Sequence, residues 1–441
     1  MTHERIRAVL RWGVMLCVFL LPWQTRWIWR TGRLAGGHWE YGTLGIAAVD
    51  ILLVILLVTA LLMVRQRAVP FTRAPRFWVV AAALLVVVTA SSFIAKDTGL
   101  ALFTAATLVE GLALVWLWMV VRATPADAAW SIGGAAVLQG IVSLGEFWRQ
   151  QVPAEKWLGL AAQDPADAGT SVIETTGGRF LRGYGSLHPI VLAGLLAAAL
   201  LLVLTWIVVH RGRRAIPGQV AAPFIMLGLI LTFSRIGWIS VAVGVATLII
   251  LVRATIRDRL LVGRTWAAAA LTAVTMAAFA LVFAPLVTTR LQGSARLEQI
   301  SIAERNQAFD DATALISDTW YRGVGAGNTT LAIADLVAPG RKSYGYQPPN
   351  SLPIVILTEL GVVGLILFLW VVVETVRMGI RAIGTRRDTP RVWAIGSLAA
   401  FFALLFTGLF DHTLWTLHAG ALFFWWVVGV VLQGTAADES P

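Results

Sequence analysis

Arg235 is the residue whose type and surroundings most clearly indicate chemistry. It stands in the stretch "ILTFSRIGWIS" (residues 230–240) and is the only ionisable side chain between Phe224 and Val252. An arginine at the centre of a bilayer costs at least ~2.5–3.5 kcal/mol on insertion scales. Arg235 is therefore either an anchor at a membrane interface or a functional group, and from the residues alone we favour the anchor.

A second group of candidate residues lies in "GGRFLRGYGSLHPI" (residues 177–190), which contains Arg179, Arg182 and His188. Glycines let the backbone approach a ligand closely, and the two arginines could bind phosphate oxygens. The alternative is a tight turn whose arginines extend to lipid headgroups. The sequence supports both interpretations equally.

Two further places combine acidic groups with apolar surroundings. Glu359 lies inside the apolar run "LPIVILTELGVVGLILF", and an ionisable residue within a membrane span is a functional candidate by default, although a structural hydrogen bond would explain it equally well. Asp411 and His412, in "FDHTLWT", form either a proton-transfer pair or an ordinary polar turn, and we favour the turn.

Patterns typical of metal ligands are missing from the sequence. The six histidines show no ligand spacing, and no group of Asp and Glu resembles an oxygen cage. The single cysteine, Cys17, excludes an intramolecular disulfide and a cysteine cluster. We predict that the protein binds no metal and no cofactor.

The composition indicates what positions these residues. Of 441 residues, 58% are hydrophobic and 13% are charged, and the mean hydropathy is +0.77. These values are typical of a polytopic, all-α membrane protein in one domain, residues 1–441. The net charge of +11 reflects arginines at the ends of loops, so nucleic-acid binding is not expected.

Since a span needs about 20 apolar residues, the sequence predicts about twelve spans, near 9–25, 43–64, 77–95, 99–121, 128–146, 189–210, 218–233, 236–252, 265–285, 351–375, 392–410 and 414–432.

The distribution of arginines predicts the orientation of these spans. With the N-terminus inside, both termini are cytoplasmic and the inner segments carry clusters of arginine: Arg5, Arg7, Arg11, Arg65, Arg67, Arg73, Arg76, Arg122, Arg211, Arg213, Arg214, Arg253, Arg257, Arg259, Arg264, Arg377, Arg381, Arg386, Arg387 and Arg391. The outer side then has two long loops, about 147–188 and 286–350, and Arg235 lies at the outer interface between two helices. These loops carry most of the remaining arginines, which suggests that something anionic binds there: Arg179, Arg182, Arg290, Arg296, Arg305, Arg322 and Arg341.

The second outer loop has helical periodicity. Ser301 to Glu304, "SIAE", has the form of a capping box, and apolar residues recur after it at helical spacing. We expect an amphipathic helix on the membrane surface, followed by a flexible glycine turn in "RGVGAGN" (residues 322–328) and a short helix ending before Pro339.

The order of these segments resembles the O-antigen ligase and polymerase family of bacterial envelope enzymes. The segments are "GRFLRGYGSLHP", "LTFSRIGW", "DTWYRGVGAGN" and "NSLP" followed by "ELGVVGLILF". The resemblance implies a metal-independent glycosyltransferase in the inner membrane that acts on its outer face. The donor would be a glycan on a polyprenyl diphosphate, such as undecaprenyl diphosphate. The acceptor would be a lipopolysaccharide core sugar or other glycolipid for a ligase, and a second lipid-linked unit for a polymerase. The oligomeric state stays open.

The resemblance also implies roles for individual residues. Arg235 and Arg305 would bind the diphosphate, and Arg182 with His188 would match the family's earlier Arg-Gly and His-Pro element. Arg179, Arg322, Asn350, Asp411 and His412 are further candidates for contacts with the substrates. The family often has a His-Asn pair where this chain has Pro349-Asn350. Either Glu359, His188, Asp411 or His412 would then accept the proton of the acceptor hydroxyl, or the reaction needs no activated base. Two alternatives remain: a transporter or flippase, and a non-catalytic binding protein for lipid-linked glycans, which Pro349 favours.

Overall fold

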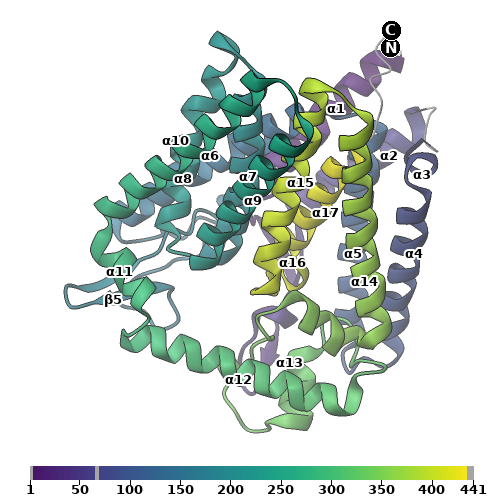
Figure 1. Ribbon diagram of the computed structural model, residues 1–441. Coiled ribbons are helices and arrows are strands. Elements are labelled where there is room, and N and C mark those ends of the chain that lie inside the picture. Colours follow the sequence, from purple (N-terminus) through teal and green to yellow (C-terminus); the bar gives the residue numbers. More distant parts are fainter. Residues whose placement is uncertain (1–2, 65–68, 435–441) are drawn as a thin grey trace.

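The structure is a computed structural model that describes residues 3–64 and 69–434 (Figure 1). Helices make up 74% of it and strands 6%, which confirms the all-α class. Arg65, Arg67 and both ends of the chain lie outside the described residues, so the position of the termini remains a prediction.

The long helices are these: α1 (His3–Leu20), α2 (Ala48–Met63), α4 (Pro75–Ala90), α5 (Thr98–Val120), α6 (Pro125–Arg149), α7 (Pro189–Val209), α8 (Ile216–Leu231), α9 (Arg235–Thr255), α10 (Arg259–Val282), α12 (Arg296–Thr319), α14 (Leu352–Thr385), α15 (Asp388–Leu409) and α17 (His418–Gln433). The shorter ones are α3 (Val69–Arg73), α11 (Ala284–Gln292), α13 (Thr329–Ala332) and α16 (Thr413–Thr416). Three antiparallel strand pairs complete the fold: β1 (Arg26–Arg30) with β4 (Leu44–Ala47), β2 (Arg33–Leu34) with β3 (Gly37–His38), and β5 (Val172–Thr175) with β6 (Gly178–Leu181).

Nine helices in the described part of the chain are long and apolar enough to cross a membrane: α4 with its extension to Phe93, the helix Gly212–Leu231 that contains α8, and α5, α6, α7, α9, α10, α14 and α15. The other three predicted spans coincide with α1, which carries several charges, and with α2 and α17, which have 16 residues each. The count of twelve therefore stays a prediction. The predicted start of the second span at residue 43 is wrong, because residues 44–47 pair with β1 as a strand.

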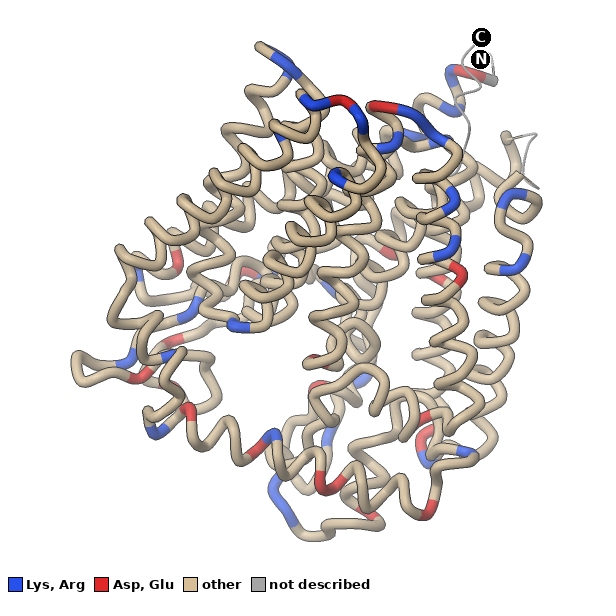
Figure 2. Tube along the Cα trace, viewed as in Figure 1, with Lys and Arg blue, Asp and Glu red and all other residues tan. Residues whose placement is uncertain are grey.

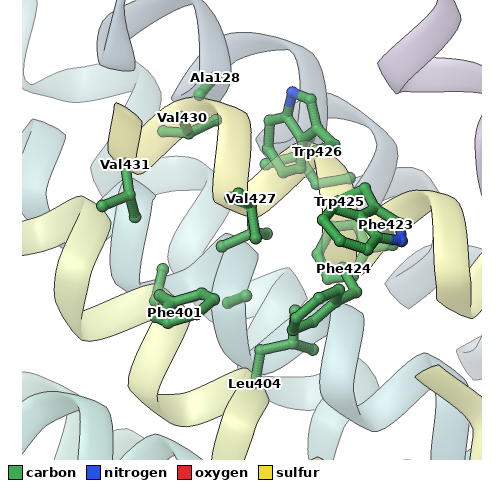
Figure 3. Packing of buried hydrophobic residues seen from close by; sticks show 14 of the residues in the cluster. Ala128, Phe401, Leu404, Phe423, Phe424, Trp425, Trp426, Val427, Val430 and Val431 are labelled. Atoms are coloured by element: carbon green, nitrogen blue, oxygen red, sulfur yellow. The ribbon is translucent and has the colours of Figure 1, made fainter. Parts of the chain in front are cut away.

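The centre of the bundle is formed by α7 and α15, whose most apolar stretches are 83% and 78% buried. The α7 sequence is apolar on every side, so it has no face suited to water. At one side of this core, Phe401 of α15 and Phe424 of α17 lie with ring centroids 6.0 Å apart (Figure 3). Helix α17 packs in turn on α5, where the rings of Trp118 and Trp426 lie edge to face with their centroids 5.6 Å apart.

Charged residues differ between the two ends of the bundle. Lys and Arg gather at the end where α1 begins and where α7 joins α8, α9 joins α10 and α14 joins α15 (Figure 2). The opposite end, which we call the loop end, carries residues 147–188 and 286–350 and mixes both signs of charge. The predicted orientation of the chain in the membrane rests on this asymmetry.

The predicted turn near Ser234 is confirmed. Helix α8 ends at Leu231 and α9 begins at Arg235, and the Ser234 hydroxyl accepts a hydrogen bond from the Gly237 amide at 3.3 Å. Phe233 has φ of +46°, which turns the chain between the two helices. Its ring is fully buried in a small apolar cluster with Ile173 and Leu286. The turn is therefore anchored to both long loops.

The predicted helix in the second loop exists as α12, but its start was predicted wrongly. Ser301 does not cap the helix, because α12 begins five residues earlier at Arg296. The first turn contains Glu298, which is buried against arginines from other helices, and this tertiary contact extends the helix beyond the local capping signal.

The glycine turn is packed rather than flexible. Helix α14 is broken at Gly361, which has φ of +66°, and the Val324 and Gly325 amides donate to the free carbonyls of Thr358 and Glu359 at 3.0 and 2.9 Å. A Cβ on Gly323 would lie 2.3 Å from the Glu359 carbonyl oxygen. The glycines therefore permit a close backbone approach between the end of α12 and the break in α14.

Candidate functional site

Two buried arginines are held by the carbonyls of the α8–α9 turn. The Arg182 Nε donates to the Thr232 carbonyl at 2.7 Å and its Nη1 to the Ser171 hydroxyl at 2.8 Å. The Arg290 Nε donates to the Phe233 carbonyl at 3.1 Å. Carbonyls at the C-terminal end of a helix lack partners within it and carry partial negative charge, so the end of α8 is suited to cations. The turn thereby draws residues 182 and 290 together.

Glu298 ties this pair to Arg235. Its carboxylate is 4% exposed, forms an ion pair with Arg290 and lies 3.5 Å from the Arg235 Nη2. The Arg235 Nη1 also donates to the Arg290 carbonyl at 3.1 Å. Three elements, α9, α11 and α12, thus meet at one carboxylate.

Arg305 completes a group that we call the arginine cluster: Arg182, Arg235, Arg290 and Arg305. Arg305 lies seven residues after Glu298, about two helical turns along α12. Burial and the nearby charges of Arg290 and Arg235 lower its pKa. Arg305 is half-buried, and no hydrogen bond or ion pair joins it to the other described residues. The Arg182 Nη2 is fully buried and also has no hydrogen-bond partner among them. Four guanidinium groups face one glutamate, so the cluster holds excess positive charge and free donors for an anion.

His188 and Asp411 lie next to the arginine cluster. His188 caps the start of α7, where the Ile190 amide points to its Nδ1 at 3.5 Å. His188 is exposed to solvent, although the surrounding protein, with the positive charges of Arg182 and Arg305, lowers the pKa of its ring from the usual 6.5. Asp411 is buried, accepts a hydrogen bond from the Thr413 amide at 2.8 Å, and acts electrostatically on both His188 and Arg305.

His412 forms the edge of this region. Its Nδ1 lies 2.6 Å from the Thr416 hydroxyl, and its ring packs edge to face on Tyr41 at 5.6 Å. Burial lowers its pKa. The sequence motif around Asp411 is thus a well-bonded turn, and it also faces the arginine cluster.

Three candidates from the sequence are engaged or exposed elsewhere. Arg179 donates to the carbonyls of Ala166 and Asp167 at 3.1 and 3.3 Å, which holds the first loop together. Arg322 is exposed and lies over the Tyr321 ring, 5.8 Å from its centroid. Asn350 is half-buried before α14.

Glu359 has a set of partners of its own. The Trp415 Nε1 donates to its Oε2 at 2.8 Å and the Thr329 hydroxyl to its Oε1 at 3.3 Å. The carboxylate is 2% exposed. These bonds join α14 to α13 and α16, and they satisfy both oxygens, as a structural role requires.

The sequence interpretation missed two residues, Arg290 as a site residue and Glu298 altogether. Arg290 was one of several outer arginines, and nothing local separated it from Arg296. Glu298 could have been noticed as an acidic residue eight positions after Arg290. It lies in the first turn of a helix, however, where carboxylates are common because they interact favourably with the helix dipole.

One comparison with known proteins covers part of this site. Residues 220–369 match the family model described as O-antigen ligase. That segment runs from α8 into α14 and includes Arg235, Arg290, Glu298 and Arg305. No curated protein matches the chain.

Proposed function

The chain is a member of the O-antigen ligase family through residues 220–369, and from this premise we propose that it transfers a glycan from a polyprenyl diphosphate to an acceptor sugar. The reaction takes place at the loop end, on the outer face of a bacterial inner membrane. The observation that carries the proposal is the arginine cluster, in which Arg305 is half-buried beside Arg235 and Arg290 and has no hydrogen-bond or ion-pair partner among the described residues.

The cluster suits a diphosphate leaving group. When the sugar leaves, negative charge develops on the phosphate oxygens, and donors fixed at that position stabilise the transition state in a water-poor site. Arg235 and Arg305 contact the diphosphate, together with the free Nη2 of Arg182. Arg290 already donates to the Phe233 carbonyl and pairs with Glu298, so it positions the other arginines of the cluster and does not bind the diphosphate itself.

An apolar groove that runs from the same end into the bundle fits the polyprenyl tail. It has a volume of about 460 Å³, and its lining is almost entirely apolar. Its floor is α15, and its walls are α9 and α14, which lie on either side of α15 in Figure 1. The groove includes Leu352 at the start of α14 and Leu409 at the end of α15, two residues before Asp411. A prenyl chain lying here would place its diphosphate at the loop end.

His188 is the group best placed to accept the proton of the acceptor hydroxyl. The hydroxyl oxygen forms a bond to the anomeric carbon, the bond from that carbon to the diphosphate oxygen breaks, and the proton passes to the His188 Nε2. Its Nδ1 faces the Ile190 amide, which leaves Nε2 available. Glu359 is a poorer base, because both its oxygens already accept hydrogen bonds.

Arg235→Lys is expected to lower turnover by roughly 10- to 100-fold. Lysine keeps the charge but loses the planar pair of donors that grips two phosphate oxygens. The measurement is transfer from a purified lipid-linked donor in proteoliposomes, with membrane insertion checked in parallel. Near-normal turnover would mean that Arg235 is only an interfacial anchor.

The pH profile of kcat/KM tests the base. Because its pKa is lowered to about 4, His188 is neutral and able to accept a proton throughout the neutral range, so we expect activity to fall only as the pH approaches 4 and not near the usual 6.5. His188→Asn is expected to remove this acid limb and to reduce kcat by about 10²–10⁴-fold. An unchanged limb in the variant would assign the proton to another group.

Gene deletion tests the function itself through the polyprenyl-linked glycans that remain in the membrane. Long chains accumulating on the lipid identify a ligase, and single repeat units with loss of surface polymer identify a polymerase. An unchanged lipid-linked pool and unchanged surface glycan, in a strain without a second copy, would count against both. That result would favour a non-catalytic protein, for which Pro349 is the sequence argument.

A further inference from the structure

A cavity of about 90 Å³ with a mixed polar and apolar lining lies at the loop end, apart from the arginine cluster. Its walls come from the β1–β4 segment, α5, α13, α14 and the link between α16 and α17. We infer that this cavity binds one neutral sugar ring of the acceptor glycan, an inference that rests on the proposed transfer reaction.

The lining has the chemistry that a sugar ring requires. Six threonine side chains and the aromatic rings of Tyr41, Phe103 and Trp415 surround the cavity. Hydroxyl groups both donate and accept hydrogen bonds, as ring hydroxyls do, and aromatic faces pack on the C–H faces of a pyranose. Thr330 is 1% exposed, and among the described residues its hydroxyl has no hydrogen-bond partner. A buried hydroxyl left unsatisfied is costly, so Thr330 brings an unused donor and acceptor to the cavity wall.

The charges around the cavity exclude the other parts of the substrates. Its arginine, Arg26, is paired with Glu40 at 2.5 Å, and Glu359 adds a second carboxylate. His418 is paired with both Asp50 and Glu110, at 3.1 and 2.9 Å. No unpaired cation therefore lines the cavity in the described part of the chain, and a diphosphate would be repelled. The polar groups in the walls disfavour a prenyl chain.

The position of the cavity favours the acceptor over the donor. Tyr41 lines it and packs on His412, and the adjacent Asp411 acts electrostatically on Arg305 and His188. The cavity therefore borders the place where the acceptor hydroxyl must react. The arginine cluster and the apolar groove already provide for the donor's diphosphate and tail. Since a water needs roughly 10–15 Å³ of such space, the cavity has room for a single ring and not for an extended glycan.

Saturation-transfer NMR tests this inference without requiring turnover. The protein is placed in nanodiscs free of sugar-headed detergent, and glucose, galactose, N-acetylglucosamine and rhamnose are added separately as probes. At least one should receive saturation from the wild-type protein and roughly three- to tenfold less from Thr330→Val, the loss of one hydrogen bond. Thr313→Val is the matched control, because that hydroxyl is exposed and bonds only within α12. Thr330→Val removes an unpartnered hydroxyl, so folding should persist. Glu40→Gln is a second variant: Glu40 also lines the cavity, its side chain is 44% exposed, and its loss should likewise reduce the saturation received by the sugar.

The KM values for the acceptor and for the lipid-linked donor then show which of the two supplies the sugar that binds in the cavity. A rise in the KM for the acceptor in Thr330→Val, with the KM for the lipid-linked donor unchanged, supports the inference. A rise in the donor KM alone assigns the cavity to the donor's first sugar and overturns it. Absence of saturation transfer to all four sugars, or transfer equal in Thr330→Val and wild type, also overturns it. If sugar binding depends on Thr330 but the protein transfers no glycan, the cavity stands and the proposed function fails.

Discussion

Arg305→Ala is expected to lower turnover by about 10²–10³-fold, the effect of removing one donor fixed at a developing negative charge, while leaving the free energy of unfolding nearly unchanged. Arg305 is half-buried beside Arg235 and Arg290, and it has no hydrogen-bond or ion-pair partner among the described residues. Removing it relieves repulsion and breaks no bond. A residue held this way serves a ligand and not the fold. The measurements are turnover in proteoliposomes and denaturant unfolding in mixed micelles.

Arg296→Ala is the matched control for Arg305. It lies on the same helix and pairs with Glu174 at 2.8 Å, but its side chain is 67% exposed. An exposed ion pair contributes only about 0–1 kcal/mol, so both activity and stability should change little. Equal losses of turnover in the two variants would mean that α12 acts through its general charge, and the assignment of Arg305 to the diphosphate would be wrong.

Inorganic pyrophosphate offers a second measurement on Arg305. If the arginine cluster binds a diphosphate, pyrophosphate should inhibit the wild-type protein and raise its unfolding temperature, because a ligand that binds only the folded state stabilises it. Both effects should be weaker in Arg305→Ala and unchanged in Arg296→Ala. Stabilisation that is the same in all three proteins would indicate nonspecific anion binding.

The helices were predictable because apolar length and arginine placement are local properties of the sequence. The turn before Arg235 followed from an apolar run too long for one span. The start of α12 and the packing of "RGVGAGN" were not predictable, since the first depends on contacts of Glu298 and the second on a break in α14 at Gly361. The local signals were misleading in both places. The "SIAE" motif favoured a later helix start, and the set of glycines favoured a flexible turn.

The same division holds for the candidate site. Arg182, Arg235 and Arg305 could be chosen from residue type and resemblance, and the structure gathers them with His188 and Asp411. Arg290 could not be chosen, because its importance comes from the Phe233 carbonyl and Glu298. Glu359 resembles a catalytic carboxylate in the sequence, but Trp415 and Thr329 occupy it in the fold.

Glu298→Gln is expected to have the largest effect on stability, a loss of about 3–5 kcal/mol, the usual result of removing one partner from a buried ion pair. Arg290 would remain buried beside Arg182, Arg235 and Arg305 without the carboxylate that compensates them. Turnover should fall as well, because Arg235 loses a partner that positions it. Denaturant unfolding in mixed micelles measures the first effect, and hydrogen exchange of α11 and α12 locates it.

Glu174→Gln is the matched control for Glu298, since it removes the other glutamate that pairs with an arginine near α12. That pair is more exposed, so its loss should cost at most about 1 kcal/mol. If both variants are equally stable, the buried carboxylate does not hold the cluster together. If Glu298→Gln unfolds early but keeps full turnover, the cluster is structural, and the diphosphate must bind elsewhere. A carboxylate inside an anion site is otherwise unfavourable for the ligand, and the protein keeps it because four arginines cannot be packed together without it.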